Sequence, residues 1–365
     1  MKNNIAFFLP NLYGGGAERA VINLLKGLRE KDSSIPLDLV LGKLEGAYVN
    51  QIPKQVRVIN FSKDRVIKSI IPLNNYLQEV KPQALVSQMS HANVIVTIAK
   101  YLSQTETRLI LVEQNNLSHN KSKLFRGKFV PFFMKLVYPY ADEIIGVSHD
   151  VSRDLENQLN LPKGRVKTIY NPIVDDDLIY QANLPITHSW FEAKDYPTIL
   201  AVGRLTEQKD FATLIEGFAI LRKKRMVRLI ILGEGELRED LEKLVTELGI
   251  SKDVIMPGFV DNPYQYMKNA DVFVLSSKWE GFGNVIVEAM ACGCPVVSTN
   301  CPSGPGEILA SGKYGSLVPT ENPEALSEAI LNVLNQPIKP DILKQRAENF
   351  SIKESVSKYC KVIGI

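Results

Sequence analysis

Two glutamates that lie eight positions apart, Glu280 and Glu288, could together bind a ligand through their carboxylates. They belong to the segment WEGFGNVIVEAMACG, residues 279–293, and stand on either side of a bend that contains Gly281 and Gly283. Glycine lets a backbone approach a ligand closely because it carries no Cβ. Carboxylates beside such a bend can accept hydrogen bonds from the hydroxyl groups of a ligand. The simpler alternative is a pair of surface charges, because two glutamates at this spacing arise often by chance.

A short helix is predicted to follow this bend. Asn284 is suited by residue type to the N-cap, and Gly293 is suited to the position that ends the helix. The start of a helix presents backbone N–H groups and the positive end of the helix dipole, which together favour an anion such as a phosphate. Glu288 lies four residues beyond Asn284 and shares its face. Because carboxylates repel a phosphate, we expect both glutamates to hold hydroxyls, and the segment indicates a nucleotide sugar as the ligand.

A second segment, VGRLTEQKD (residues 202–210), places two cations directly after a predicted strand. Arg204 can bind phosphate oxygens bidentately, and Lys209 supplies a point charge. Fixed cations stabilise a leaving diphosphate, because negative charge accumulates on it in the transition state. A solvated loop is the alternative interpretation of the same residues.

Three consecutive glycines, Gly14, Gly15 and Gly16, lie between the first predicted strand and the first predicted helix. Such a loop can wrap a phosphate or let a sugar approach the backbone. The pattern differs from the G-x-G-x-x-G of dinucleotide-binding proteins, because Arg19 occupies the third glycine position. The sequence therefore argues against a nicotinamide-dependent dehydrogenase.

A histidine, His91, follows another predicted strand, ALVSQ (residues 84–88). At the carboxyl end of that strand, its neutral imidazole can hydrogen-bond a sugar hydroxyl. The alternative is a structural histidine whose hydrogen bonds are satisfied within the protein.

The segment KSKLFRGKFVPFFMKLVY, residues 121–138, interleaves basic and aromatic residues. Basic side chains suit an anionic lipid surface, and aromatic rings suit the headgroup boundary. The same interleaving suits single-stranded nucleic acid, and an ordinary half-buried helix is an equal alternative. The candidates for a membrane-facing surface are Lys121, Lys123, Phe125, Arg126, Lys128 and Phe129.

Short β-branched runs alternate with amphipathic stretches along the whole chain, a pattern that predicts parallel sheets covered by helices on both faces. The fold class is therefore α/β, with two Rossmann-like doubly wound domains that face a central cleft. The polar segment after Asn171-Pro172 separates the two sets of strands. The predicted strands are 5–9, 37–41, 56–60, 84–88, 108–112 and 143–147, then 198–203, 227–233, 253–258, 271–276, 295–299 and 315–319. The predicted domains are 1–170, 171–345 and a C-terminal helix, 346–365, that packs back on the first domain.

Composition narrows the class of protein further. The 365 residues are 45% hydrophobic and 23% charged, as in globular proteins with a sizeable core. Residues 1–170 carry 23 Lys and Arg against 14 Asp and Glu, which suits an anionic partner of the first domain. The four cysteines fit no zinc spacing and are expected to be buried thiols. Without a signal-peptide or membrane-spanning pattern, we expect a cytoplasmic protein, peripheral on the membrane face.

The motifs together resemble those of the retaining nucleotide-sugar glycosyltransferases of family 4, which have the GT-B fold. The matching segments are GGGAER, GRLTEQKD, PGFV and EGFGNVIVEAMACGCPVVSTNCPSGPGEIL. The resemblance covers nearly the whole chain and is strongest over residues 198–310. Within the family, the chain looks most like bacterial enzymes that extend lipid-linked or cell-surface glycans.

The resemblance implies a role for each motif. Glu280 would contact the donor sugar, Glu288 would bind the ribose hydroxyls, Arg204 and Lys209 would hold the diphosphate, and His91 would lie beside the transferred sugar. The backbone of the bend and the helix start would line the donor. Where the family often has glycine after its lysine, this chain has Asp210, which is expected to cap the next helix. The remaining implied donor-binding residues are Gly15, Gly16, Phe259, Val260, Gly281, Phe282, Gly283, Asn284 and Val285.

The resemblance also implies transfer with retention, from a uridine-diphosphate sugar to a glycan or lipid-linked acceptor, with no metal or other cofactor and no nucleic acid as partner. The expected chemistry is front-face attack, in which a phosphate oxygen takes the proton of the acceptor hydroxyl. The run Asp175–Asp177 is interpreted as solvated charge in the linker rather than as metal ligands. Two alternatives stay open: a sugar-nucleotide epimerase of the same fold, and a binding protein without catalysis.

Overall fold

The structure is a computed structural model that describes residues 4–118, 129–193 and 195–365. Its contacts divide the chain into two compact units. Unit 1 comprises Met1–Pro172 with Ile352–Ile365, and unit 2 comprises Ile173–Ser351. The boundary expected at residue 171 lies two residues before the start of unit 2.

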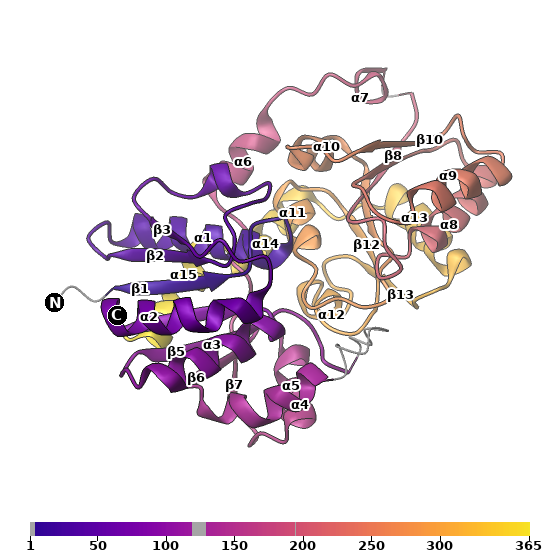
Figure 1. Cartoon of the computed structure of the whole chain (residues 1–365). Coiled ribbons are helices and arrows are strands. Elements are labelled where there is room, and N and C mark those ends of the chain that lie inside the picture. Colours follow the sequence, from indigo (N-terminus) through magenta and orange to yellow (C-terminus); the bar gives the residue numbers. More distant parts are fainter. Residues whose placement is uncertain (1–3, 119–128, 194) are drawn as a thin grey trace. The chain divides into compact units, whose positions relative to one another are not determined.

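Unit 1 is built on a seven-stranded parallel sheet with the strand order β3-β2-β1-β4-β5-β6-β7. Helix α3 packs against β1, β4 and β5, and α2 packs against α3 (Figure 1). The strands are β1 (Ile5–Leu9), β2 (Leu37–Leu41), β3 (Arg57–Asn60), β4 (Ala84–Gln88), β5 (Arg108–Glu113), β6 (Glu143–Gly146) and β7 (Val166–Thr168). The helices are α1 (Gly16–Lys31), α2 (Ile70–Val80), α3 (Ser90–Ser103), α4 (Phe129–Val137), α5 (His149–Leu159) and α15 (Ile352–Ile363), with short 3₁₀ turns η1 (Val49–Gln51), η2 (Val66–Ser69) and η4 (Tyr138–Tyr140).

Unit 2 repeats this design with six parallel strands in the order β10-β9-β8-β11-β12-β13. The strands are β8 (Thr198–Val202), β9 (Arg228–Leu232), β10 (Val254–Gly258), β11 (Val272–Leu275), β12 (Val296–Thr299) and β13 (Ser316–Val318). The helices are α6 (Asp176–Asn183), α7 (Ser189–Ala193), α8 (Phe211–Lys224), α9 (Arg238–Glu247), α10 (Pro263–Asn269), α11 (Asn284–Ala291), α12 (Pro305–Ile308), α13 (Pro323–Asn335) and α14 (Pro340–Ala347), followed by the 3₁₀ turn η5 (Glu348–Phe350).

Every predicted strand is present, with ends that agree to within one residue. Strand β7 is not among the predicted strands, because its three residues are too few for a periodic signal. The interpretation of Asp175 as solvated linker charge is wrong. Its side chain accepts a hydrogen bond from Leu178 N at 2.8 Å and caps α6. A carboxylate there satisfies an N–H that has no partner within the helix and opposes the positive end of its dipole.

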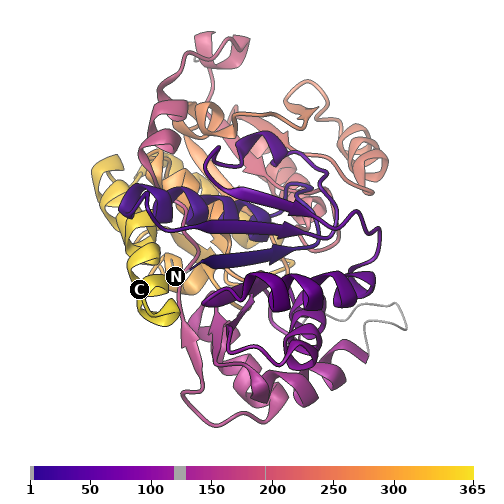
Figure 2. The same ribbon diagram turned by 60° about the vertical axis from the view of Figure 1, so that its left-hand side comes forward.

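In unit 1, the helix that follows unit 2 in the chain packs directly on the first helix. The yellow α15 lies beside the indigo α1 (Figure 2). A Cβ added at Gly27 of α1 would lie 2.3 Å from Ile352 Cγ2 and 2.8 Å from Val356 Cγ2. Glycine at this position therefore lets the two helices approach closely, and α15 is an integral layer of unit 1.

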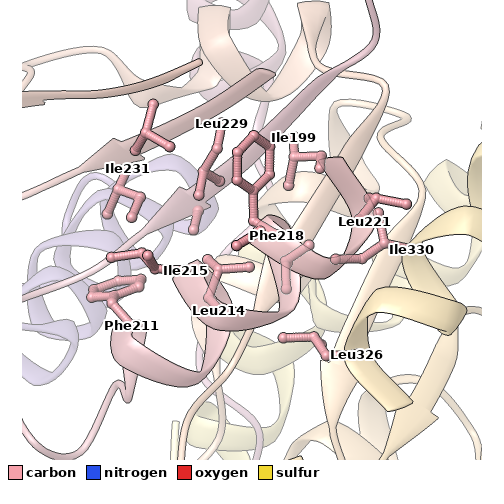
Figure 3. Packing of buried hydrophobic residues seen from close by; sticks show 14 of the residues in the cluster. Ile199, Phe211, Leu214, Ile215, Phe218, Leu221, Leu229, Ile231, Leu326 and Ile330 are labelled. Carbon is pink, nitrogen blue, oxygen red and sulfur yellow. The ribbon is translucent and has the colours of Figure 1, made fainter. Parts of the chain in front are cut away.

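The core of unit 2 lies between its sheet and the helices α8 and α13. Phe218 of α8 packs beside Leu229 of β9 and Ile199 of β8, while Leu326 and Ile330 of α13 close the other side of α8 (Figure 3). All five side chains have 0% exposure. Burial of this much apolar surface makes the sheet a rigid support for the loops at its carboxyl edge.

The four cysteines are buried and unpaired, as predicted. Burial raises the pKa of the Cys301 thiol to about 12, with a further contribution from the negative charge of Glu280. The pKa values of Cys292 and Cys294 are raised by burial as well, so these three thiols stay protonated at neutral pH. Among the described residues, no helix has the length and apolar character needed to cross a membrane.

Candidate functional site

Each sheet has one point at which the strand order reverses, and ligands of open α/β sheets bind outside the carboxyl ends of the strands there. In unit 2 this point lies between β8 and β11, and in unit 1 it lies between β1 and β4. The loops after these four strands contain most of the residues that the sequence singled out. Topology thus brings Arg204 and Lys209 to the same edge as Glu280, and it brings the glycine loop to the same edge as His91.

An ion pair joins the two loops at the switch point of unit 2. Lys209 Nζ lies 2.5 Å from Glu280 Oε1, and the side chains of both residues are largely buried, with 16% and 8% exposure. Ser277 Oγ also donates to Glu280 Oε1, at 2.7 Å. The lysine and the glutamate therefore act together as an ion pair, whereas the sequence analysis expects the lysine to bind the diphosphate and the glutamate to bind the sugar.

This arrangement leaves specific groups for a ligand. None of the described residues donates a hydrogen bond to the second oxygen of Glu280, Oε2, so this oxygen can accept from a hydroxyl. The side chain of Arg204 is exposed, and no described residue pairs with its guanidinium. Because Glu280 partly neutralises Lys209, Arg204 is the stronger candidate for the first contact with an incoming diphosphate.

Hydrogen bonds hold the loop after β8 against the loop after β11. Ser276 Oγ donates to Lys209 O at 2.8 Å, and Gln208 Nε2 donates to Trp279 O at 2.9 Å. Asp210 occupies the N-cap position of α8, but its side chain accepts from Thr213 Oγ1 at 2.7 Å and bonds to no backbone N–H. Its φ of +47° is a left-handed conformation, which glycine adopts freely and which aspartate is one of the few other residues to tolerate.

Helix α11 begins one residue earlier than predicted. Its N-cap is Gly283, with φ +95°, and Asn284 is the first helical residue. The prediction of Asn284 as N-cap is wrong because the bend needs a left-handed residue there, which glycine adopts without strain. The first turn, with Asn284 and Val285 half-buried, still presents N–H groups that have no partner within the helix. Glu288 lies one turn further on, 6% exposed, and makes contacts within the protein.

The structure gives contacts for a third loop, the segment after β12, which lies within the last matching motif but has no role in the sequence analysis. Glu280 N donates to Pro302 O at 3.2 Å, and Thr299 Oγ1 donates to Ser277 O at 2.6 Å. Gly304 has φ +88°, and a Cβ there would lie 1.7 Å from Phe282 O. The loop after β12 therefore supports the bend through these hydrogen bonds. Glycine is required at position 304 because the backbone of Phe282 lies so close.

The other predicted donor-binding residues of unit 2 have varied surroundings. Gly281 and Phe282 are buried, and the Phe282 ring packs edge-on against Phe350 at 5.5 Å between centroids. Phe282 can therefore offer a ligand its backbone but not its ring. Phe259, 64% exposed, and half-buried Val260 directly follow β10.

In unit 1, the glycine loop after β1 is braced by the chain after β2. Tyr48 O–H donates to Gly14 O at 3.3 Å and accepts from Arg19 Nε at 3.0 Å. Gly14 has φ +114°, Gly15 is the N-cap of α1, and Gly16 is its first residue. The backbone at Gly15 and Gly16 therefore lies at the start of a helix, where the carboxylate of Glu18 also lies: a Cβ at Gly15 would be 2.5 Å from Glu18 Oε2.

His91 is the second residue of α3 and is exposed at the carboxyl edge of β4. Desolvation by the surrounding protein lowers the pKa of His91 below its ordinary value, so the ring is neutral at physiological pH. Met89, the residue between β4 and α3, has φ +82°, a costly conformation for a side chain with a Cβ.

The remaining expectations concern the membrane and metals. Phe129 begins α4, whereas five membrane-facing candidates lie outside the described residues. These are Lys121, Lys123, Phe125, Arg126 and Lys128. Within the described ranges, no group of three or more His, Cys, Asp or Glu residues is arranged to hold a metal ion.

Comparison with known families gives two adjacent matches. Residues 14–177 match the family described as Glycosyltransferase Family 4, and residues 186–350 match the family described as Glycosyl transferases group 1. The first match covers the glycine loop and the β4–α3 turn, and the second covers the charged loops of unit 2.

Two curated relatives from Campylobacter jejuni align with nearly the whole chain. One is N-acetylgalactosamine-N,N'-diacetylbacillosaminyl-diphospho-undecaprenol 4-alpha-N-acetylgalactosaminyltransferase, 30% identical over 94% of this chain and 93% of the relative. The other is an alpha-1,4-N-acetyl-D-galactosaminyltransferase whose named acceptor is also a diphospho-undecaprenol glycan, 26% identical over 99% and 98%. A lipopolysaccharide core biosynthesis glycosyltransferase of Rhizobium meliloti is 41% identical over 38% of this chain and 40% of its own.

Solved structures share the fold over the full length of the chain. A glycosyltransferase from Rickettsia africae has a TM-score of 0.80 at 19% identity, covering 99% of this chain and 98% of its own. HepE of Anabaena, in complex with UDP and glucose, has a TM-score of 0.78 at 20% identity and 99% coverage of both chains. Lipopolysaccharide outer core galactosyltransferase WaaB has a TM-score of 0.76 at 21% identity, also with 99% coverage of both.

Proposed function

The chain belongs to the family 4 glycosyltransferases, and from this premise we propose that it transfers a hexosyl or N-acetylhexosaminyl group from a UDP-linked donor, with retention, to a hydroxyl of a lipid-linked or cell-surface glycan. The observation that carries the proposal is the switch point of unit 2. There an exposed arginine, a buried lysine–glutamate pair and the start of α11 meet at one edge of a rigid sheet.

The donor would be held by both of its chemical parts. Arg204 and the first turn of α11 would bind the diphosphate, whereas Glu280 Oε2 would accept a hydrogen bond from a sugar hydroxyl and Glu288 would bind the ribose. The ion pair with Lys209 and the hydrogen bond from Ser277 fix the orientation of Glu280. Binding therefore selects a ligand that carries phosphate and hydroxyls together.

The reaction we propose is a front-face substitution. The acceptor hydroxyl attacks the anomeric carbon from the side on which the diphosphate leaves, and a phosphate oxygen takes its proton. The protein would contribute placement and charge stabilisation, with Arg204 and Lys209 opposing the charge that develops on the leaving group. His91, neutral and exposed, would hydrogen-bond the transferred sugar.

Support for the donor and acceptor comes from the relatives. HepE, which shares the fold, has been solved with UDP and with UDP-glucose. Both Campylobacter relatives are named as transferring N-acetylgalactosamine to diphospho-undecaprenol glycans. These names favour a uridine nucleotide and an acceptor that is anchored in a membrane.

Contact with an anionic membrane forms part of the proposal. On α4, the side chains of Phe132, Phe133 and Leu136 are exposed by 57%, 45% and 53%. Tyr101 and Tyr140, also exposed, stack edge-on at 6.3 Å between centroids. Exposed aromatic and aliphatic side chains on a helix that carries no acidic residue suit the interface of an anionic bilayer.

The decisive experiment combines binding with transfer. A thermal-shift panel of UDP-, GDP- and ADP-sugars should single out UDP-sugars, because a ligand of the native state raises the melting temperature. The preferred donor should then extend a diphospho-polyprenol disaccharide, and NMR of the product should show retention at the anomeric carbon. No shift with any nucleotide sugar, or hydrolysis in place of transfer, would contradict the proposal.

We also propose that transfer needs no resident metal, because cationic side chains occupy the place at which charge develops. Dialysis against EDTA should leave the rate unchanged within about twofold, since Arg204 and Lys209 remain. A loss that Mg²⁺ or Mn²⁺ restores would contradict this part of the proposal.

A further inference from the structure

A buried carboxylate lies one strand away from the switch point of unit 1. Glu113 is the last residue of β5 and has 1% exposure. No lysine or arginine among the described residues pairs with it. A buried acidic group without a cation is costly unless it is hydrogen-bonded, so its surroundings indicate what it does for the protein.

Three neutral side chains surround this carboxylate. Ser90 Oγ donates to Glu113 Oε2 at 2.8 Å, and Asn93 Nδ2 donates to Oε1 at 2.8 Å. Tyr138 O–H donates to the same Oε1, and Asn93 also bonds to Val112 O at 2.9 Å. The partners come from the first turn of α3 and from η4, so Glu113 ties both segments to the end of β5.

The burial of this group has a measurable consequence. Desolvation raises the pKa of Glu113 to about 7, although the hydrogen bonds from Tyr138, Ser90 and Asn93 lower it. Tyr138 is the titratable side chain in contact with it, and burial raises the pKa of that phenol well above its ordinary value. The carboxyl group is therefore held at an energetic cost that a purely apolar packing would avoid.

The β4–α3 turn, to which Glu113 is hydrogen-bonded through Ser90, is strained. Met89 has φ +82° and ψ +129°, outside the regions that residues with a Cβ favour. Such strain persists only where the surroundings over-determine the conformation, and it concentrates at functional sites. Ser90, bound by Glu113, directly follows Met89 and directly precedes His91. Ser90 therefore lies between the strained residue and the histidine, and it is also the residue that donates a hydrogen bond to Glu113.

We propose that Glu113 is a positioning residue: through Ser90 and Asn93 it holds the strained β4–α3 turn and so fixes His91 at the carboxyl edge of the unit 1 sheet. The role of His91 in transfer rests on the proposed function, whereas its fixation by Glu113 does not. Glu113 itself is buried and touches no substrate in this scheme.

The first test observes His91 directly. In ¹H–¹³C NMR of the full chain, the His91 signal is identified by its loss in His91→Gln. Ser90→Ala, which changes no charge, should raise the pKa of His91 by about 0.3 units or more, because a looser turn lets the ring move away from the protein groups that desolvate it. The matched control is Ser103→Ala at the other end of α3, where Ser103 Oγ donates to Lys100 O at 2.8 Å. An identical His91 titration in both variants would overturn the inference.

The second test measures transfer with the preferred UDP-sugar. Glu113→Gln keeps the volume but removes one acceptor oxygen, and it should lower kcat about 10- to 100-fold with a donor KM changed by less than about threefold. The matched control is Asp38→Asn, at a buried carboxylate that accepts from Asn4, Arg57 and Tyr76 near the start of β2. It should change kcat by less than about threefold in folded protein.

A double-mutant cycle separates positioning from stability. If Glu113 acts through His91, then adding Glu113→Gln to His91→Ala should cause no further loss of kcat. Independent, multiplicative losses would overturn the inference, and so would a wild-type kcat in Glu113→Gln. A wild-type protein that transfers no sugar would contradict the proposed function instead, and the His91 titration would still decide the positioning.

Discussion

The two switch points have the same topology but carry different side chains. In unit 2, the loops after β8 and β11 present Arg204 and the Lys209–Glu280 pair. In unit 1, the loops after β1 and β4 present glycines and the neutral His91, with Glu18 in the first turn of α1 beside Gly15 and Glu113 buried among neutral partners. The shared sheet order therefore does not determine what the edge can bind.

Under the proposed function, this difference indicates which part of the donor each edge would bind. The exposed arginine and the ion pair of unit 2 would suit a diphosphate that gains negative charge during the reaction, whereas the glycine backbone and the neutral imidazole of unit 1 would suit hydroxyls. The two edges differ in their loop residues rather than in their fold. Four predictions test the proposed roles of the two units.

The largest effect is expected from Lys209→Ala. Removal of the cation should lower kcat/KM about 10²- to 10³-fold, because in the proposed mechanism Lys209 would oppose the leaving charge and its ion pair would orient Glu280. Steady-state transfer assays, corrected for the folded fraction, measure this loss. Lys243→Ala is the control, since Lys243 pairs with Glu247 at 3.7 Å on the exposed face of α9. A folded Lys209→Ala protein with the wild-type rate would remove the charged edge from the mechanism.

The next effect is the dependence of stability on pH in unit 1. The unfolded chain releases the Glu113 proton near its ordinary pKa of 4.5, whereas the folded protein keeps it until about pH 7. The stability that this group contributes is therefore complete below pH 4.5 and is lost as the pH rises to 7, by about 3 kcal/mol in total. Denaturant unfolding at pH 5 and pH 8 should show this slope in the wild type.

The same experiment on variants assigns the slope. Glu113→Gln should abolish it, because the amide does not titrate. Asp38 provides the contrast. Burial opposes its ionisation, but hydrogen bonds from Arg57, Tyr76 and Asn4 prevail and lower the pKa of Asp38, so its contribution is lost as the pH falls. A slope that survives in Glu113→Gln would show that another group titrates.

Glu288→Ala should have a smaller effect on unit 2. Loss of the ribose contacts is expected to lower kcat/KM about 10- to 100-fold while the fold is kept. Glu328→Ala, on the exposed side of α13, is the matched control. Transfer at the wild-type rate in folded Glu288→Ala protein would leave ribose recognition without its proposed carboxylate.

The smallest effect is expected at α4. Phe132→Ser and Phe133→Ser should each weaken binding to vesicles of phosphatidylglycerol and phosphatidylcholine up to about tenfold, since each removes apolar surface that the bilayer would bury. Co-sedimentation measures this, with Tyr180→Ser as control because Tyr180 is an exposed aromatic residue of unit 2. Equal co-sedimentation of wild type and both variants would exclude α4 from the interface. Neutralising the preceding basic residues should also weaken binding, namely Lys121, Lys123, Arg126 and Lys128.

The sequence predicted the strands well because apolar β-branched runs bounded by loops are a local signal, and it missed β7 because Val166–Thr168 is too short. The pairing of Lys209 with Glu280 could not be predicted, since the two residues are 71 positions apart and meet only because β8 and β11 are neighbours. Asn284 was assigned to the N-cap because residue type was considered without the left-handed turn at Gly283.

Glu113 shows a different limit of sequence analysis. A single acidic residue at the end of an apolar run resembles a solvent-facing strand end, and nothing local indicates that it is buried. Its partners Ser90 and Asn93 come from the preceding crossover, and Tyr138 comes from the following one. This hydrogen-bond network forms only when β5, α3 and η4 are packed together, so no local sequence pattern predicts it.

The packing of α15 on α1 has a consequence for how the protein is made. The close contact of Gly27 with Ile352 and Val356 belongs to unit 1, yet the ribosome reaches those residues only after synthesising all of unit 2. Until then, the apolar stripe of α1 lacks its cover in the nascent chain. Unit 2 can therefore fold before unit 1 is complete, although it is translated second. A fragment that stops at Pro172 would leave the α15-binding face of α1 exposed to chaperones.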